Sequence, residues 1–153
     1  MRVVVAVVGK PRDALAAPIR DYETRAARYW PLDIHEVREE PARSVSADVV
    51  RTREAERLTS KVPAGALVVA CDEQGTSMTS SEFASWLQSE RERARDVAFV
   101  IGGAYGLAPS LRERSNRRLS LAPWTLPHEL ARLVLAEQLY RAGTIVRGEP
   151  YHK

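Results

Sequence analysis

The stretch Leu119-Ser-Leu-Ala-Pro-Trp-Thr-Leu-Pro-His-Glu-Leu-Ala-Arg-Leu-Val-Leu-Ala-Glu-Gln138 decides the fold. It predicts a short apolar strand at Leu119–Leu121, a tight loop with two prolines, and an amphipathic helix over about Pro127–Ala142. The loop is apolar, although a polar turn is expected at such a place. An apolar loop at the carboxyl end of a strand must be buried or must hold something apolar and flat.

Strands alternate with helices along the rest of the chain. Apolar runs and alternation predict strands at residues 2–8, 32–37, 66–72 and 97–101. Apolar spacings of three and four residues predict a helix from Leu15 to Tyr29, and Ser46 is expected to cap a second. A capping box from Thr79 to Glu82 predicts a third. The last helix is expected to place these residues on one side: Leu130, Leu133, Val134, Glu137 and Tyr140.

This alternation predicts one α/β domain over residues 1–153, with a mostly parallel sheet flanked by helices. Such sheets bind ligands beyond the carboxyl ends of their strands. Three strand ends are expected to converge there, at Cys71-Asp72, at Gly102-Gly103 and in the loop Leu121–Leu126. The sequence therefore predicts a binding site at this edge of the sheet.

Composition limits the class of protein. With 44% hydrophobic and 28% charged residues the chain is expected to be globular, and no apolar run is long enough for a membrane span. The apolar start is interpreted as a strand and not as a signal peptide, which predicts a cytosolic protein. Residues 103–153 hold eight basic and four acidic residues, so their excess positive charge indicates an anionic partner or only a soluble arginine-rich surface.

Few residues stand in catalytic patterns. The pattern Gly102-Gly103-x-x-Gly106 lets backbone approach a ligand, but turn glycines would look the same. No metal site is expected, because the three histidines stand far apart and Cys71 is the single cysteine. Trp124 is expected to be core packing or a wall against a flat ligand. By position alone, residues near the C-terminus are expected to be disordered.

Several ordered motifs resemble one known family. They are Phe99-Val-Ile-Gly-Gly-x-x-Gly-Leu107, Leu119-Ser-Leu121, Thr125-Leu-Pro-His128, Arg132-x-x-Leu-x-Glu137-Gln-x-Tyr140-Arg-Ala142 and Pro150-Tyr-His-Lys153. Together they resemble the RlmH (YbeA-like) family of bacterial 23S ribosomal RNA pseudouridine N3-methyltransferases, in the SPOUT class. The resemblance spans essentially the whole chain. It is strong from Val97 to the end and weak over residues 39–60.

The resemblance implies a SPOUT-type α/β fold with a C-terminal trefoil knot, a feature nearly absent from other proteins. It implies a homodimer that binds S-adenosylmethionine and methylates N3 of a pseudouridine in the helix-69 loop of 23S rRNA, on the assembled ribosome. By motif match the cofactor-binding residues would be Cys71, Gly102, Gly103, Leu121, Ala122, Pro123, Trp124, Thr125 and Leu126. Cys71 stands where the family commonly has leucine, and Ala104-Tyr105 stands at a variable site.

The resemblance also implies a role for the tail. His152 is the candidate general base, because its intrinsic pKa suits proton transfer near neutrality, and Tyr151 and Arg147 would hold substrate. Arg132, Arg141 and Lys153 are expected to contact RNA. The two arginines could instead pair with Glu129 and Glu137 on their own helix.

Three other functions stay open. The chain could methylate another RNA such as tRNA, or it could be a ribosome-binding factor without catalytic activity. An enzyme acting on small molecules is the weakest alternative, because the chain has no nucleophile motif, metal site or dinucleotide fingerprint.

Overall fold

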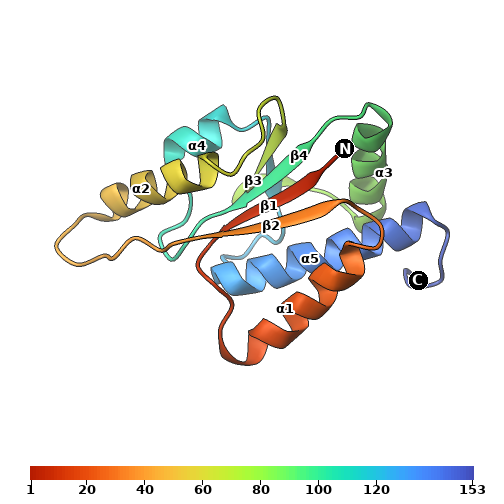
Figure 1. Ribbon diagram of the computed structural model, residues 1–153, viewed down its shortest axis with the longest axis horizontal. Helices are drawn as coiled ribbons and strands as arrows, with labels where there is room; N and C mark the ends of the chain where they lie inside the picture. The colour runs from red at the N-terminus through yellow and green to blue at the C-terminus, as the bar shows by residue number, and fades with distance from the viewer.

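A five-stranded sheet forms the centre of the molecule in the computed structural model, which describes all 153 residues (Figure 1). The strands are β1 (Val3–Val8), β2 (Leu32–Val37), β3 (Leu67–Ser77), β4 (Val97–Ile101) and β5 (Arg117–Ser120). They lie in the order β2-β1-β4-β3-β5, and every neighbouring pair is parallel. The predicted parallel α/β architecture is confirmed, whereas the trefoil knot stays a prediction.

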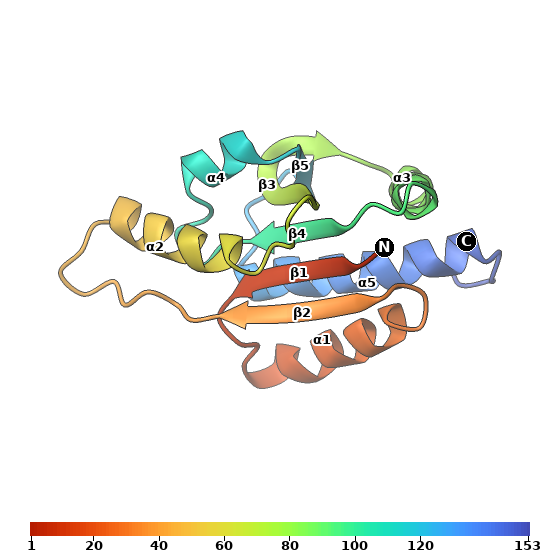
Figure 2. The same cartoon turned by 45° about the horizontal axis from the view of Figure 1, so that its top comes forward.

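Helices cover both faces of the sheet, as Figure 2 shows. One face carries α1 (Asp13–Ala26), α3 (Ser80–Glu92) and α5 (His128–Val146), and the other carries α2 (Ala47–Thr59) and α4 (Pro109–Arg114). The alternation of side chains along a strand explains the two cores. Val3, Val5 and Val7 pack on the α5 side, whereas Ala6 and Val8 pack against α2 and α4. None of the five helices is long and apolar enough to cross a membrane.

Two helix caps form as the sequence predicts. The Ser46 hydroxyl accepts a hydrogen bond from the backbone N–H of Val49 at the start of α2. At the start of α3, Thr79 and Glu82 form the reciprocal capping box. Each cap satisfies backbone donors that the first turn of a helix leaves without partners.

Strand β3 is longer than predicted. The sequence predicts a strand that ends at residue 72, but β3 continues to Ser77 through an irregularity between Cys71 and Thr76. Both of these residues pair with Leu119 of β5, and a Cβ at Gly75 would lie only 2.6 Å from the backbone of Arg118. The last residues of β3 are largely exposed and polar, so they lack the apolar pattern from which a strand is predicted.

Helix α5 differs from the prediction in its length and in its buried face. It continues to Val146 and does not end at Ala142, because Gly143 packs against Tyr29, where a Cβ would lie 2.3 Å from the ring Cγ. The predicted face was also wrong, and the buried residues are Arg132, Leu135, Ala136, Leu139, Ala142, Gly143 and Thr144. Since α5 packs between α1 and α3 and also on the sheet, its flanks are half-buried and the apolar periodicity is blurred.

Candidate functional site

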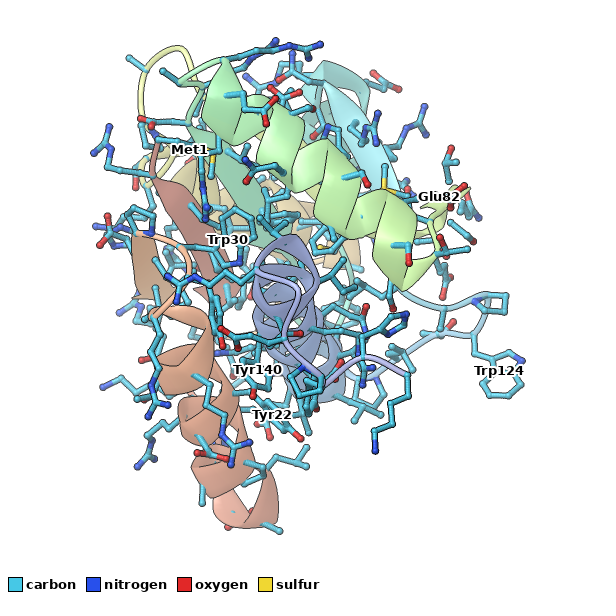
Figure 3. All side chains as sticks on the ribbon, turned by 90° about the vertical axis from the view of Figure 1, so that its right-hand side faces the viewer. Met1, Tyr22, Trp30, Glu82, Trp124 and Tyr140 are labelled. Atoms are coloured by element: carbon cyan, nitrogen blue, oxygen red, sulfur yellow. The ribbon has the colours of Figure 1, made fainter.

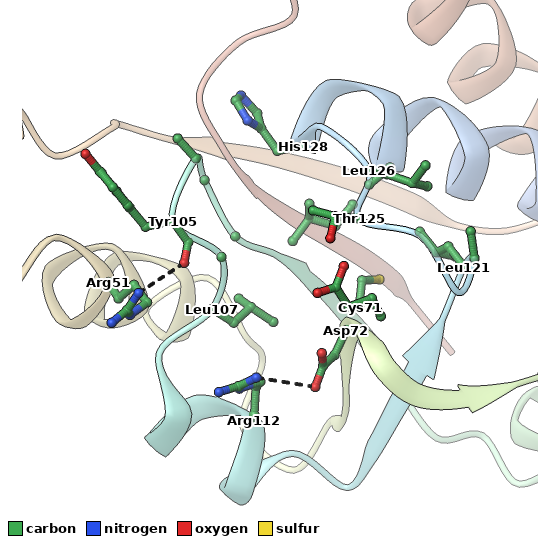
Figure 4. Close-up of a pocket in the computed structure, with 18 of the residues that line it drawn as sticks. Arg51, Cys71, Asp72, Tyr105, Leu107, Arg112, Leu121, Thr125, Leu126 and His128 are labelled. Atoms are coloured by element: carbon green, nitrogen blue, oxygen red, sulfur yellow. Dashed lines mark hydrogen bonds and ion pairs between the residues drawn. The ribbon is translucent and has the colours of Figure 1, made fainter. Parts of the chain in front are cut away.

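A cavity of about 490 Å³ opens at the carboxyl ends of the central strands (Figure 4). Residues 71–73 in the middle of β3, the turn after β4 and the loop after β5 all line it, together with residues of α2, α4 and the first turn of α5. The three segments that the sequence predicts at strand ends therefore converge, although β3 continues beyond Asp72 to Ser77. Of the nine predicted cofactor-binding residues, every one except Pro123 lines this cavity.

The glycines after β4 bring bare backbone to the cavity wall. A Cβ on Gly102 would lie 2.5 Å from the carbonyl carbon of Gly106, so only glycine fits there. Gly106 has a φ of +78°, and its N–H donates to the Gly103 carbonyl at 3.0 Å. These residues are turn glycines, and the same turn also leaves main chain exposed to whatever enters the cavity.

The loop Leu121–Leu126 forms the opposite wall. The Ser120 hydroxyl donates to the Ala122 carbonyl at 2.8 Å, which holds the loop against the end of β5. Trp124 is 78% exposed and lines the cavity, and Figure 3 shows it projecting from the body of the molecule. The core-packing alternative for Trp124 is therefore wrong, and its role as a wall against a flat ligand stays a prediction.

Charged residues also line the cavity, and they are Arg51, Asp72, Glu73 and Arg112. His128 joins them from the start of α5, with its Nε2 3.8 Å from Oε1 of Glu39. Asp72 was predicted near the site because it closes the strand expected at residues 66–72, although β3 continues beyond it. Arg51 and Arg112 could not, because neither stands in a motif or at the end of a predicted strand.

Cys71 contributes shape rather than nucleophilic chemistry. Burial raises the pKa of its thiol to about 12, so the sulfur stays protonated at neutral pH.

The predicted catalytic residues lie away from this cavity, near the C-terminal end of α5. The Tyr151 hydroxyl donates to Oε1 of Glu137 at 3.0 Å, and Nη1 of Arg141 lies 3.2 Å from Nδ1 of His152. Arg147 donates to the carbonyl of Arg28 at 3.1 Å. The tail is thus docked on the helix, contrary to the disorder expected of a terminus. None of the three candidates Arg147, Tyr151 and His152 lines the cavity.

The surroundings of the tail keep the Tyr151 phenol neutral. Burial, followed by contacts with Tyr22 and Glu137, raises the pKa of this hydroxyl above its ordinary value. The guanidinium of Arg141 lies over the Tyr151 ring at 4.7 Å from its centroid and also donates to Glu137. The i,i+4 pairing of Arg141 with Glu137 that the sequence left open is therefore present.

Arg132 has a different environment from the one the sequence suggested. Its side chain is only 6% exposed, and it donates to Glu23 of α1 at 2.7 Å and to Glu36 of β2 at 3.0 Å. Neither the predicted RNA contact nor the alternative pair with Glu129 fits this geometry. Arg132 instead ties α5 to α1 and to the edge of the sheet, whereas Lys153 is exposed.

Comparisons with known proteins agree with this architecture. A family described as predicted SPOUT methyltransferase matches residues 1–152. The chain is 71% identical to the Ribosomal RNA large subunit methyltransferase H of Gemmatimonas aurantiaca, covering 100% of both chains. It is 44% identical to the protein of the same name from Geobacter metallireducens, covering 99% of both.

Solved structures share the fold at low sequence identity. A probable methyltransferase from Bordetella pertussis aligns over 92% of this chain and 95% of its own, with a TM-score of 0.54 and 16% identity. A probable methylase family protein from Haemophilus influenzae aligns over 99% of this chain and 70% of its own, with a TM-score of 0.53 and 15% identity. By its match to the family over residues 1–152 and its 71% identity to a full-length relative, the chain belongs to the SPOUT methyltransferase family.

Proposed function

We propose that this protein transfers a methyl group from S-adenosylmethionine to N3 of a pseudouridine in the helix-69 loop of 23S rRNA, on the assembled ribosome in the cytoplasm. The full-length relative at 71% identity carries the name of a large-subunit ribosomal RNA methyltransferase. The observation that carries the proposal is the cavity itself, where an apolar loop after β5 and a glycine turn after β4 meet beside residues 71–73 of β3. The trefoil knot of the SPOUT class belongs to the same proposal.

The residues that line the cavity fit this cofactor. A volume of about 490 Å³ lies in the range that encloses a ligand of this size. Backbone groups of Leu121–Leu126 would hydrogen-bond the adenine between apolar side chains, while Gly102 and Gly103 let main chain approach without steric hindrance. When bound, the cofactor supplies a methyl group activated by its sulfonium. The protein residues orient that group and exclude water.

Proton removal from N3 of the target base is assigned to His152. In the docked tail Arg141, which can only donate, faces Nδ1 of His152 at 3.2 Å, so the neutral ring carries its proton on Nε2. The basic lone pair of His152 is therefore engaged while the tail rests on α5. His152 becomes free to accept a proton only when this contact opens.

The position of His152 relative to α5 supports a second copy as the source of the tail. The nineteen residues of α5 span about 28 Å, with the cavity at the first turn and Arg147 just beyond the last. The five residues from Gly148 to His152 reach about 17 Å when fully extended. Because its own tail is too short, we infer a homodimer in which the tail of one copy meets the cavity of the other.

Exposed aromatic residues at the cavity suit an RNA substrate. Tyr105 and Trp124 are the exposed large hydrophobic residues of the chain, and both line the cavity. Aromatic faces stack on the unpaired bases of RNA loops. Arg141 and Lys153 would add contacts with phosphates, in keeping with the basic C-terminal third.

The test uses ribosomes from a strain that lacks the gene. These ribosomes are incubated with the purified protein and labelled S-adenosylmethionine, and the helix-69 loop is then analysed by mass spectrometry. We expect one new methyl group on the pseudouridine, whereas labelling of tRNA alone would move the substrate to another RNA. His152→Ala should lose turnover while it keeps its affinity for S-adenosylhomocysteine. If the wild-type protein binds no cofactor, the role of a ribosome-binding factor without catalytic activity is favoured.

A further inference from the structure

The cavity contains a buried carboxylate oxygen that has no hydrogen-bond partner. The Asp72 side chain is 6% exposed, and its Oδ1 accepts a hydrogen bond from the backbone N–H of Gln74 at 3.1 Å. Its Oδ2 is inaccessible to solvent and accepts no hydrogen bond. A buried acceptor without a partner costs free energy, which a donor supplied by a ligand would recover.

Arg112 of α4 forms an ion pair with this oxygen but no hydrogen bond. Its Nη1 lies 3.8 Å from Asp72 Oδ2, too far for a hydrogen bond, and its side chain is 30% exposed. Other arginine–carboxylate pairs of this chain do form hydrogen bonds. Each oxygen of Glu40 accepts one, from Arg53 or from Arg57. Asp72 and Arg112 therefore form a loose ion pair without a hydrogen bond, and both residues line the cavity.

The position of Asp72 and Arg112 in the cavity indicates which end of the cofactor would lie beside them. Figure 4 shows Asp72 and Arg112 directed toward one another on the α4 side of the cavity, away from Leu121 and Leu126 of the loop. If the adenine lies against that loop, the opposite end of the cofactor extends toward α4. That end is an amino acid with an ammonium and a carboxylate, whereas the adenine and the ribose are neutral.

We propose that Asp72 and Arg112 form a subsite for the amino-acid end of the cofactor. Arg112 turns its guanidinium away from Asp72 to donate to the α-carboxylate, and the Oδ2 atom that this movement uncovers accepts a hydrogen bond from the α-ammonium. The subsite rests on the proposed function, because it takes S-adenosylmethionine as the ligand. It extends that function by giving a role to two residues outside the apolar loop and the glycine turn.

The test compares two ligands that differ at this end. S-adenosylhomocysteine carries both charges, whereas 5′-methylthioadenosine keeps the adenosine and the sulfur but lacks the amino acid. By calorimetry, Asp72→Asn and Arg112→Gln should each weaken S-adenosylhomocysteine about tenfold or more. Both variants should keep the affinity for 5′-methylthioadenosine within about twofold. Glu113→Gln is the matched control, because it removes an exposed carboxylate from α4 that does not line the cavity.

The outcomes separate the two proposals. Equal weakening of both ligands by Asp72→Asn would overturn the subsite, because the carboxylate would then serve the ribose or the fold. Unchanged affinity of both variants for S-adenosylhomocysteine, or an equal loss in Glu113→Gln, would overturn it as well. If the wild-type protein binds neither ligand, the proposed cofactor itself is wrong. Thermal unfolding of each variant shows whether it is folded before its affinity is interpreted.

Discussion

Replacing Arg132 by alanine tests whether this residue stabilises the fold or binds RNA. The guanidinium makes three hydrogen bonds, at 2.7 and 3.2 Å to Glu23 and at 3.0 Å to Glu36. Truncation would leave two carboxylates facing each other around a buried void. Breaking a buried ion pair from one side costs about 3–5 kcal/mol, and we expect about 3 kcal/mol because the Glu36 side chain is 30% exposed.

This loss is large enough to measure. For a domain of this length each kcal/mol shifts the midpoint of thermal unfolding by about 2–4 °C, so Arg132→Ala should lower it by about 6–12 °C. The assay is circular dichroism or calorimetry at a fixed protein concentration, since a dimer would make the midpoint depend on concentration. Arg132→Lys should fall between wild type and alanine, because lysine keeps the charge but loses the planar fork.

Arg20 provides the matched control. It is exposed on α1, and its substitution by alanine should change the stability by less than about 0.5 kcal/mol. At a temperature where Arg132→Ala is still folded, its KM for ribosomes should equal that of the wild type. A raised KM with an unchanged unfolding midpoint would refute the structural assignment and restore the RNA contact.

Three further variants address the packing around the site. Gly143→Ala should lower the unfolding midpoint, because the new methyl group would lie 2.3 Å from Cγ of Tyr29 and the overpacking costs about 1–3 kcal/mol; an unchanged or raised midpoint would contradict this packing. Burial raises the pKa of Glu54, so the contribution of this residue to the free energy of unfolding falls as pH rises from about 4 through that pKa. The stability of Glu54→Gln relative to wild type should therefore increase over the same pH range in unfolding titrations. Gly102→Ala should weaken S-adenosylhomocysteine in calorimetry, because its Cβ would meet the Gly106 backbone at 2.5 Å and force the turn open; equal affinity would show that the turn tolerates a side chain.

The location of the cavity could be predicted from sequence because it depends on local signals and one topological rule. Apolar runs that end near Cys71 and Ile101 are visible in the sequence, and parallel strands bring the carboxyl ends of such runs to one edge, although β3 itself continues to Ser77. The apolar loop after β5 was recognisable because its composition conflicts with the solvent exposure expected of a turn. These features require no knowledge of which residues far apart in the chain meet.

The ionic contacts could not be predicted, because they join distant segments. Arg132 meets Glu23 and Glu36, which lie 109 and 96 residues away in the chain, and helix spacing indicates only partners three or four residues away. The helical spacing does indicate that Arg132 is buried, since it lies on the same stripe of α5 as Leu135 and Leu139. A charged residue on a buried stripe requires a partner, but its identity comes only from the fold.

The rigidity of α5, the helix that follows the loop Leu121–Leu126, limits how His152 can move. Arg132 fixes the first half of this helix to α1, and the indole of Trp30 donates to the carbonyl of Leu139 at 2.8 Å to fix the second half. Because both halves are anchored, the cavity at one end and the docked tail at the other keep a constant separation. Movement of His152 toward any substrate therefore requires the tail to leave α5, and not α5 to bend. The loop and helix that create the cavity thus also separate it from the chain's own candidate base.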